Sequence, residues 1–402
     1  MFYRIVMNLR TGVGVRVFLQ DSYKAGAEAA RDAADRAGEA QHKIAVVFAS
    51  SHYSQLDMLH GINDTLHGIP VIGCSSAGAI TSEGVKEDAV AVLVLGSDTA
   101  TFFPVKTEKI SASMRSAGVA FASALKATAG GDPKGALIFS DALSGNGTEL
   151  VRGVLQGMGE GFPLAGAAAG DDMAFKKTFQ YYNTEALTDS AVGIGISGDA
   201  SFISAAGHGW HPIGVPRVVT KAKGTTLIEL DGKPAFSIYQ DYFEEQANDF
   251  KQALSLPAVT YPLGMRTAGI EGWMIRVPLV VNPDGSIVCG AEVMEGSEIR
   301  LMIGTPESSL TAAEQTAKIV SSTPSSDPRV VFIFDCVARK ILFGNRKEEE
   351  LQTLHNVLGA NTELFGFYSY GQIAPIRPPA TDINTCDPGF YEQSVSLTMV
   401  GK

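Results

Sequence analysis

The stretch PVIGCSSAGAI, residues 70–80, runs from an apolar segment into small residues and back to apolar ones. Two further stretches have the same character, FPLAGAAAGDD at 162–172 and LFGFYSYGQI at 364–373. Each follows a short apolar segment and an amphipathic one, and each precedes another apolar segment. The short segments are rich in β-branched residues and too short for helices, which is typical of buried strands. They are HKIAVVFAS (42–50), GALIFSD (135–141) and VVFIFDC (330–336).

A strand and a helix are also predicted before each copy, so the repeated unit is strand, helix, strand, helix, strand, strand. In the third unit, Ser309 is placed to cap the first helix and Glu314 lies in its early turns. This alternation predicts an α/β fold in which helices cover mixed sheets, built from three copies of the unit. Three glycines are expected at equivalent positions at strand ends: Gly73, Gly166 and Gly366.

Between the second and third copies lies a segment of different pattern. A long helix is predicted to open at Lys233-Pro234, because proline is tolerated in a first helical turn. A hairpin with Asp284-Gly285 in its turn is predicted further on. We therefore expect two domains, one at 1–225 with two units and one at 226–402 with the helix, the hairpin and the third unit.

Charge and composition exclude several classes of protein. The chain has 402 residues and a net charge of −11, which argues against broad binding to a nucleic-acid backbone. No apolar run approaches the roughly 18 residues of a membrane helix, and Arg4, Arg10 and Arg16 interrupt any signal-peptide core. The four cysteines form no Cys-x-x-Cys pair, so structural zinc and a disulfide framework are not expected. A cytoplasmic protein that binds neither nucleic acid nor membrane is predicted.

The three glycine-bounded stretches leave two interpretations open. Glycine permits close approach of the backbone to a ligand, and ligands of open α/β sheets commonly lie beyond strand ends. The stretches therefore either line one cleft together, or each only turns tightly over its own helix. If they line a cleft, the expected contacts are Gly73, Cys74, Ser75, Ser76, Gly78, Gly170, Asp171, Tyr368, Tyr370 and Gln372.

A catalytic nucleophile is the alternative from another class. A hydrolase or acyltransferase would use Ser75, Ser76 or Cys74. However, Ser75 has Gly73 before it but Ala77 after it, so the Gly-x-Ser-x-Gly elbow is absent. No histidine partner for Cys74 is identifiable, and small buried cysteines are common. We therefore predict no enzyme.

The segment GHGWHPIG, residues 207–214, carries His208 and His211 on either side of Gly209 and Trp210. Zinc would need a further ligand nearby. A single histidine in an apolar pocket could instead hold haem iron. His211 is favoured because Pro212 restricts its backbone to extended conformations. The other candidates are His52, His60 and His67.

Arg339 follows Asp335 just beyond a predicted strand end. Its guanidinium could clamp a carboxylate ligand in a bidentate manner, or it could pair with Asp335. These two roles differ in their consequences. A ligand clamp contributes little to stability, whereas a buried structural partner contributes much.

Taken in order, these segments resemble the FIST sensory domain family. VIGCSSAGAI, LAGAAAGDDMAF and the run beginning GHGWHPIGVPR resemble its N-terminal part, and YPLG, IRVPLVVNPDGSIVCGAEV, FIFDCVARK and FGFYSYGQIAP its C-terminal part. The resemblance covers about residues 40 to 380. The family pattern usually ends Gly-Glu-Ile, where this chain has Gly371-Gln372-Ile373, which implies a more neutral ligand.

The resemblance implies a non-enzymatic small-molecule sensor of signal transduction. Some similar proteins bind haem and sense nitric oxide, so a haem b sensor with His211 as iron ligand is the alternative. No kinase, cyclase or DNA-binding segment is apparent in the sequence. Output is therefore expected through a separate partner, such as a histidine kinase or a cyclase/phosphodiesterase, and a homodimer is compatible with the sequence. Trp210 is expected to wall the pocket, and Arg339 or Gln372 to orient polar ligand atoms.

Overall fold

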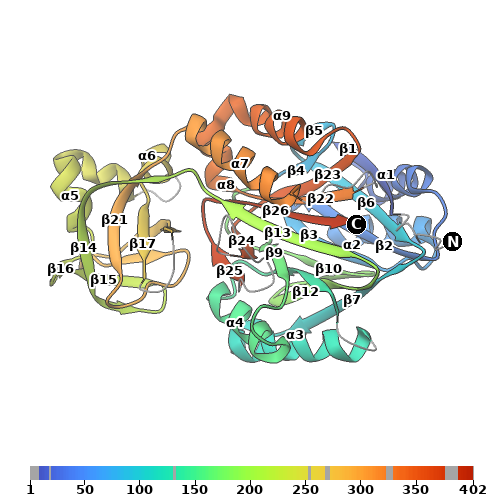
Figure 1. The fold of residues 1–402 in the computed structure, drawn as a ribbon, viewed down its shortest axis with the longest axis horizontal. Helices are drawn as coiled ribbons and strands as arrows, with labels where there is room; N and C mark the ends of the chain where they lie inside the picture. The colour runs from blue at the N-terminus through green and yellow to red at the C-terminus, as the bar shows by residue number, and fades with distance from the viewer. Residues whose placement is uncertain are drawn as a thin grey trace.

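The structure, a computed structural model, describes residues 9–17, 20–129, 133–251, 255–267, 272–322, 329–375 and 388–401. A body of three sheets, with helices around its outside, lies beside a smaller part formed by residues 211–303 (Figure 1). Within these ranges, no helix is both long and apolar enough to cross a membrane. The fold is mixed α/β, as predicted.

The body consists of three units with the same order of elements. The first contains β1 (Arg10–Val17), α1 (Ser22–Ala37), β2 (His42–Ser50), α2 (Gln55–Leu66), β3 (Val71–Ser76), β4 (Ala79–Thr81), β5 (Gly84–Lys86) and β6 (Ala89–Ser97). The second contains β7 (Ala100–Glu108), η1 (Ile110–Ala112), α3 (Met114–Ala129), β8 (Gly135–Ser140), α4 (Gly147–Met158), β9 (Leu164–Ala168), β10 (Gln180–Tyr182), β11 (Glu185–Leu187) and β12 (Ser190–Gly198). The third contains β13 (Ser201–Gly207), α7 (Pro306–Val320), β22 (Arg329–Cys336), α8 (Val337–Phe343), η3 (Gly344–Arg346), α9 (Lys347–Leu358), β23 (Thr362–Ser369), β24 (Gly371–Pro375), β25 (Pro388–Tyr391) and β26 (Val395–Gly401).

The units exchange hairpins in a cycle. The sheet orders are β1-β6-β2-β3-β10-β11, β25-β24-β9-β8-β12-β7 and β13-β26-β22-β23-β4-β5. Hairpin β4–β5 of the first unit thus completes the third sheet, β24–β25 completes the second, and β10–β11 completes the first. The sequence predicted only a loop after the third strand of each unit. The sequence did not indicate these hairpins because their strands are short and because each hairpin pairs with a strand of another unit.

The three glycines occupy equivalent positions, as predicted. Each lies opposite a residue of a parallel neighbouring strand: Gly73 opposite Val47, Gly166 opposite Ile138 and Gly366 opposite Ile333. A Cβ atom at any of them would come within 1.9 Å of that neighbour's carbonyl oxygen. They lie inside their strands rather than at the strand ends, which corrects the prediction. A close approach of two backbones, and not a turn, requires glycine there.

A phenylalanine cluster joins the three sheets at the centre of the body. Phe48, Phe139 and Phe334 each follow the residue that faces a repeat glycine. The ring centroids of Phe48 and Phe139 lie 5.3 Å apart, and those of Phe139 and Phe334 lie 5.8 Å apart. All three side chains are fully buried. The shared core therefore holds the three units together around equivalent side chains.

Helix pairs α1/α2, α3/α4 and α7/α9 cover the outer faces of the three sheets (Figure 1). Helix α7 begins after Thr305, whose hydroxyl accepts from the Ser308 N–H in a capping box. The predicted cap, Ser309, is therefore wrong. Ser309 lies inside the helix and is buried.

The smaller part is inserted in the third unit, between β13 and α7. Its sheet contains β14 (His211–Lys223), β15 (Thr226–Leu230), β16 (Lys233–Pro234), β17 (Leu263–Arg266), β18 (Met274–Arg276), β19 (Pro278–Val281), β20 (Ile287–Cys289) and β21 (Glu298–Ile303). Its helices are α5 (Ser237–Phe243), η2 (Glu244–Lys251) and α6 (Leu256–Thr260). We call this part, residues 211–303, the insert.

Two local predictions for the insert had different outcomes. The hairpin around Asp284-Gly285 is confirmed, because β19 pairs with β20 across that turn. The long helix at Lys233-Pro234 is wrong, because these two residues form β16 and pair with β15, and α5 has only seven residues. The division at residue 225 stays a prediction. Hydrogen bonds cross it, since β13 pairs with β26 and β14 with β21.

Candidate ligand-binding site

Two segments connect the insert to the body, residues 207–211 and 303–306, and they pack against each other. A Cβ on Gly304 would lie 2.3 Å from the Trp210 ring, and one on Gly209 would lie 2.7 Å from the Ser308 carbonyl oxygen. Glycine is required at both positions by these close approaches. The Trp210 indole N–H donates to the Val259 carbonyl at 3.0 Å, which fixes the ring between body and insert.

Arg339 bonds the first connection and the start of helix α7 to the core of the body. Its Nη1 donates to the His208 carbonyl at 2.7 Å and its Nη2 to the Ser309 carbonyl at 3.3 Å. The guanidinium also pairs with Asp335, at 2.8 Å, and with Glu350. Arg339 is fully buried. Burial, followed by the nearby Glu350 carboxylate, raises the pKa of Asp335.

A cavity of about 570 Å³ lies at this junction. The insert contributes His211, Gly272, Trp273 and Met274, and helix α7 contributes one face. That face consists of Ser308, Thr311, Ala312, Gln315, Thr316 and Ile319. The segment Ala206 to Trp210, with Pro375, Tyr391 and Ser394, closes the rest. We call it the junction cavity.

The two histidines of the junction cavity differ in their freedom. The Nδ1 of His208 accepts from the Trp210 N–H at 2.9 Å, which leaves Nε2 to donate to the Trp273 carbonyl at 3.1 Å. Burial lowers the pKa of His208 to about 4, so this side chain is neutral near pH 7. His211 is exposed at the start of β14. In the described part of the chain nothing bonds the His211 ring, so of the two histidines it is His211 that has ring nitrogens left for a ligand.

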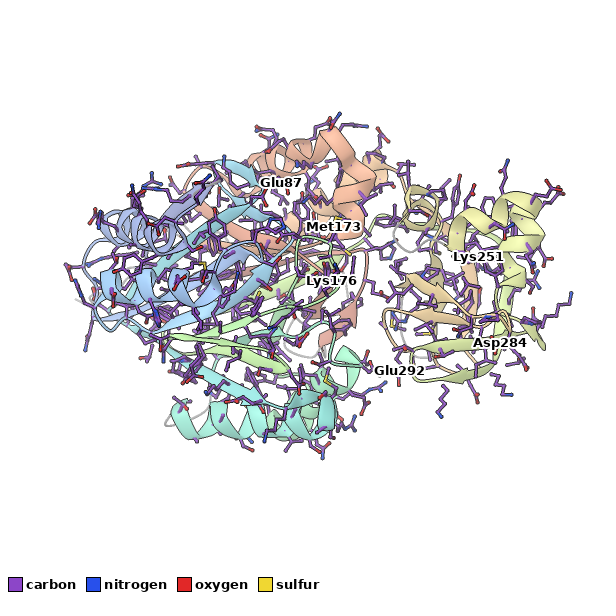
Figure 2. The ribbon with its side chains drawn as sticks, turned by 180° about the vertical axis from the view of Figure 1, so that it is seen from behind. Glu87, Met173, Lys176, Lys251, Asp284 and Glu292 are labelled. Carbon is purple, nitrogen blue, oxygen red and sulfur yellow. The ribbon has the colours of Figure 1, made fainter. Side chains whose placement is uncertain are left out.

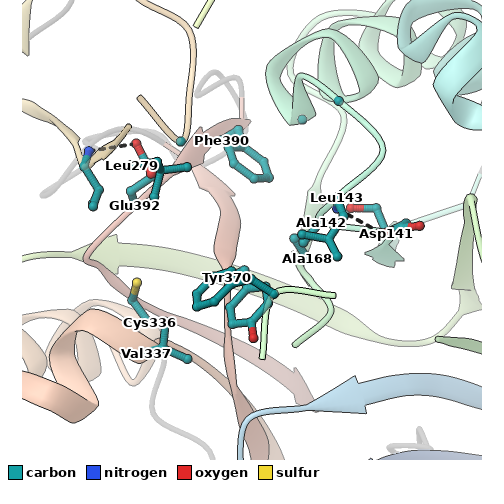
Figure 3. A pocket seen from close by; sticks show the side chains of 16 residues that line it. Asp141, Ala142, Leu143, Ala168, Leu279, Cys336, Val337, Tyr370, Phe390 and Glu392 are labelled. Carbon is teal, nitrogen blue, oxygen red and sulfur yellow. Dashed lines mark hydrogen bonds between the residues drawn. The ribbon is translucent and has the colours of Figure 1, made fainter. Parts of the chain in front are cut away.

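A second, smaller cavity of about 90 Å³ lies where the ends of β8, β9 and β22 meet the insert (Figure 3). Tyr370 and Phe390 form aromatic walls, with Asp141 on one side and Glu392 on the other. Asp141 accepts from the N–H groups of Leu143 and Asp189 and from the hydroxyls of Ser144 and Thr178. Its carboxylate thus accepts from four donors, two in its own loop and two in the segment 178–189, and is not available to a ligand.

Glu392 joins the body to the insert. Its carboxylate accepts from the Val277 N–H at 3.1 Å. Figure 2 shows a second junction group, Glu292, at the side of the insert nearest the body, where it pairs with Arg152 of α4 at 2.8 Å. Burial raises the pKa of Glu392 from 4.5 to about 7, with the Arg276 charge acting in the opposite direction.

This pKa predicts a specific pH dependence of stability. The folded state binds the Glu392 proton more tightly than the unfolded state, so raising the pH from about 4.5 to about 7 removes stability. We expect the free energy of unfolding of the wild type to fall across this range relative to Glu392→Gln. Urea unfolding of both proteins at several pH values measures the difference. Parallel pH curves would show that Glu392 titrates normally.

The three glycine-bounded loops lie against one another, as they would have to if they lined one cleft together. Ser75 and Ser76 accept through their carbonyls from the N–H groups of Gly170 and Asp172, and the Ala77 N–H donates to the Tyr368 carbonyl. The Tyr370 N–H donates to the Ala168 carbonyl. The loops thus fill the space between them with backbone hydrogen bonds. Only the second and third loops line the smaller cavity, through Ala168 and Tyr370.

The predicted contact residues are therefore divided. Trp210 and His211 line the junction cavity, and Tyr370 lines the smaller one. The others line neither of these cavities. Arg339 lies in helix α8, and the rest lie in strands or in the loop contacts; they are Gly73, Cys74, Ser75, Ser76, Gly78, Gly170, Asp171, Tyr368 and Gln372.

The polar members of that group are bonded within the protein. The Asp171 carboxylate accepts three backbone N–H groups and the Tyr370 hydroxyl. The Gln372 amide bonds the hydroxyls of Ser369 and Ser394. The ligand-orienting role predicted for Arg339 or Gln372 finds no support in this geometry, because both are fully buried and engaged.

The nucleophile alternative also finds no support. The Ser75 hydroxyl donates to the Gly170 carbonyl and accepts from the Phe179 N–H, and it is fully buried. Burial raises the pKa of Cys74 well above its usual value, so its thiol stays protonated. Among the described residues, no group of three or more potential ligands could hold a metal ion.

The junction cavity does not fit haem. His211 could supply an axial ligand there, but haem also carries two propionates that need donors or cations. Among the described lining residues there is no lysine or arginine. His52, His60 and His67 line neither cavity, and His52 pairs with Asp88 at 2.7 Å.

The sequence reasoning missed several cavity residues. Trp273, Gln315 and Tyr391 line the junction cavity but were not among the predicted contacts. A signal did exist for α7, where small and polar residues recur at helical spacing from Ser308 to Gln315. This spacing indicates a face of α7 that does not pack into the core, but it does not show which segment of the chain faces it.

Comparison with known families now adds to this geometry. The FIST N domain model matches residues 43–233, and the FIST C domain model matches residues 235–375. The chain belongs to the FIST family. The boundary between the two FIST domains lies within the insert, so the FIST C match starts partway through it.

Two curated relatives of this FIST protein are described as uncharacterized. A Methanocaldococcus jannaschii protein described as uncharacterized is 27% identical over 339 residues, covering 75% of this chain and 64% of its own length. The match therefore spans less than two thirds of that relative. An uncharacterized Mycobacterium tuberculosis protein is 25% identical, covering 92% of this chain and 95% of its own length.

Among solved structures, the cyanuric acid hydrolase of A. caulinodans aligns with a TM-score of 0.30 and 11% identity, covering 48% of this chain and 71% of that one. That similarity carries no argument about fold or activity. FIST domains are sensor domains of signal transduction.

Proposed function

We propose that this protein senses a small molecule in the junction cavity and relays its bound state to a separate signalling protein. One observation carries the proposal: the walls of the cavity come from both the body and the insert. Ligand sites occur preferentially at such interfaces between parts of a protein. A ligand there contacts both sides, so its binding energy favours one placement of the insert over others.

The connections between the two parts support this relay. The first connection lines the cavity, and Arg339 bonds the His208 carbonyl in it and the Ser309 carbonyl in the first turns of α7. A ligand that moves His208 or α7 would thus change contacts deep in the third unit. The expected partner is a histidine kinase or a cyclase/phosphodiesterase in the cytoplasm. The described cysteines Cys74, Cys289 and Cys336 are free thiols, which is compatible with that compartment.

The proposal predicts that filling the cavity removes binding. Ala312 is half-buried on the cavity face of α7, so Ala312→Phe places a ring in the space available to the ligand. We expect native mass spectrometry of protein isolated from its own cells to show a retained small molecule on the wild type. The Ala312→Phe variant should lose it. Tryptophan emission is a second readout, because both tryptophans of the chain line this cavity.

The matched control is Ala124→Phe, which enlarges a half-buried alanine on α3 in the second unit. This variant should keep the molecule if it folds as the wild type does, which its melting temperature reports. Equal retention by wild type and Ala312→Phe would place the site elsewhere and contradict the proposal.

A further inference from the structure

The described lining of the junction cavity contains no aspartate, glutamate, lysine or arginine. His208, which is half-buried in it, is neutral near pH 7 because desolvation lowers its pKa to about 4 and its Nδ1 accepts from the Trp210 N–H. Arg266 and Arg300 lie over the Trp273 ring, at 5.0 and 5.8 Å from its centroid, but neither lines the cavity. Both also pair with Glu298.

The polar groups of the α7 face are mostly satisfied within the helix. The Thr311 hydroxyl donates to the Glu307 carbonyl, and that of Thr316 donates to the Ala312 carbonyl. Ser308 is engaged in the capping box. Gln315, in contrast, is exposed and forms no hydrogen bond with the described residues. Its amide offers one acceptor and two donors to a ligand.

Aromatic side chains form part of the apolar lining of the cavity. Trp210, Trp273 and Tyr391 line it, together with Met274, Ile319 and Pro375. The Trp210 ring is fixed by its bond to Val259 and by close contact with Gly304. Rigid aromatic side chains bind flat rings at little cost in conformational entropy.

From these observations we infer that the ligand is an uncharged, planar aromatic molecule with one or two hydrogen-bonding groups. A zwitterion such as a free amino acid would bury an ammonium and a carboxylate without a counter-charge, which is costly. The Gln315 amide and the His211 imidazole are placed to bond the polar edge of a neutral ring. This inference rests on the proposed function, because it assigns the ligand class of the same cavity.

Four probes that share one ring test the inference on the full chain by calorimetry at pH 7. Indole is neutral, tryptamine is a cation, indole-3-acetate is an anion and tryptophan is a zwitterion. We expect indole to bind at least about tenfold more tightly than each charged probe, because none of them finds a counter-charge. Indole should not bind Ala312→Phe, and it should bind Ala124→Phe as it does the wild type.

A second variant tests the charge argument directly. Gln315→Glu adds a carboxylate to the lining and should shift the preference from indole towards tryptamine. Equal binding of all four probes, or tighter binding of a charged one to the wild type, would overturn the inference. So would the absence of indole binding. If the molecule retained from cells is still lost from Ala312→Phe in any of these cases, the proposed function stands and only the ligand class is wrong.

Discussion

Replacing Arg339 with alanine should lower the free energy of unfolding by about 3–5 kcal/mol, the usual cost of breaking a buried ion pair from one side. The variant leaves Asp335 and Glu350 buried without their shared cation. It also removes the donors to the carbonyls of His208, in the first connection to the insert, and of Ser309, in α7. Urea denaturation followed by circular dichroism measures the change.

Two further variants separate charge from geometry. Arg339→Lys keeps the positive charge but cannot reproduce a planar fork that reaches four acceptors, so it should recover only part of the loss. Arg346→Ala removes an arginine that pairs with Glu307 and Glu349 on the surface, and should change stability little. If Arg339→Ala unfolds at the wild-type urea concentration, the arginine does not hold the core, and a role towards a ligand returns.

The sequence could predict the order of elements because each unit repeats the same hydrophobic pattern within about 100 residues. It also predicted the equivalence of Gly73, Gly166 and Gly366, since a glycine that recurs at the same place in three similar strands can be recognised in the sequence. Phe48, Phe139 and Phe334 repeat just as regularly, at the same place in each second strand. These repeated phenylalanines could have been recognised in the sequence, and they would have identified the centre of the body.

The site was less predictable, for a physical reason. The junction cavity lies between α7, the first residues of β14 and the segment around Trp273, which are joined only by the folding of the insert onto the body. No local pattern encodes that contact. The GHGWHPIG segment was found because Trp210 and His211 are unusual residue types, whereas Gln315 looks like any exposed helical residue. Arg339 was recognised as important, but its second carboxylate, Glu350, is on another helix.

The strongest test of the threefold repeat is the same substitution at equivalent glycines. Gly73→Ala and Gly366→Ala would each place a Cβ 1.8 Å from a backbone carbonyl oxygen of the neighbouring parallel strand. A backbone group cannot move aside as a flexible side chain can, so the strands must separate at the core. We expect each variant to lose about 3 kcal/mol or more, at the upper end of the cost of overpacking. Thermal unfolding monitored by circular dichroism measures both.

Gly38→Ala is the matched control, because Gly38 has a φ of +67° and nothing within 4 Å of an added Cβ. Its cost should be only about 1–2 kcal/mol, the strain of an L-residue in the left-handed region. Gly166 combines a φ of +147° with a contact of 1.9 Å, so Gly166→Ala should be at least as damaging as the other two. If Gly73→Ala and Gly366→Ala differed widely, the two strand pairs would relax differently despite equal registers. The units would then share a topology, but replacing the equivalent glycine would not cost each unit the same stability.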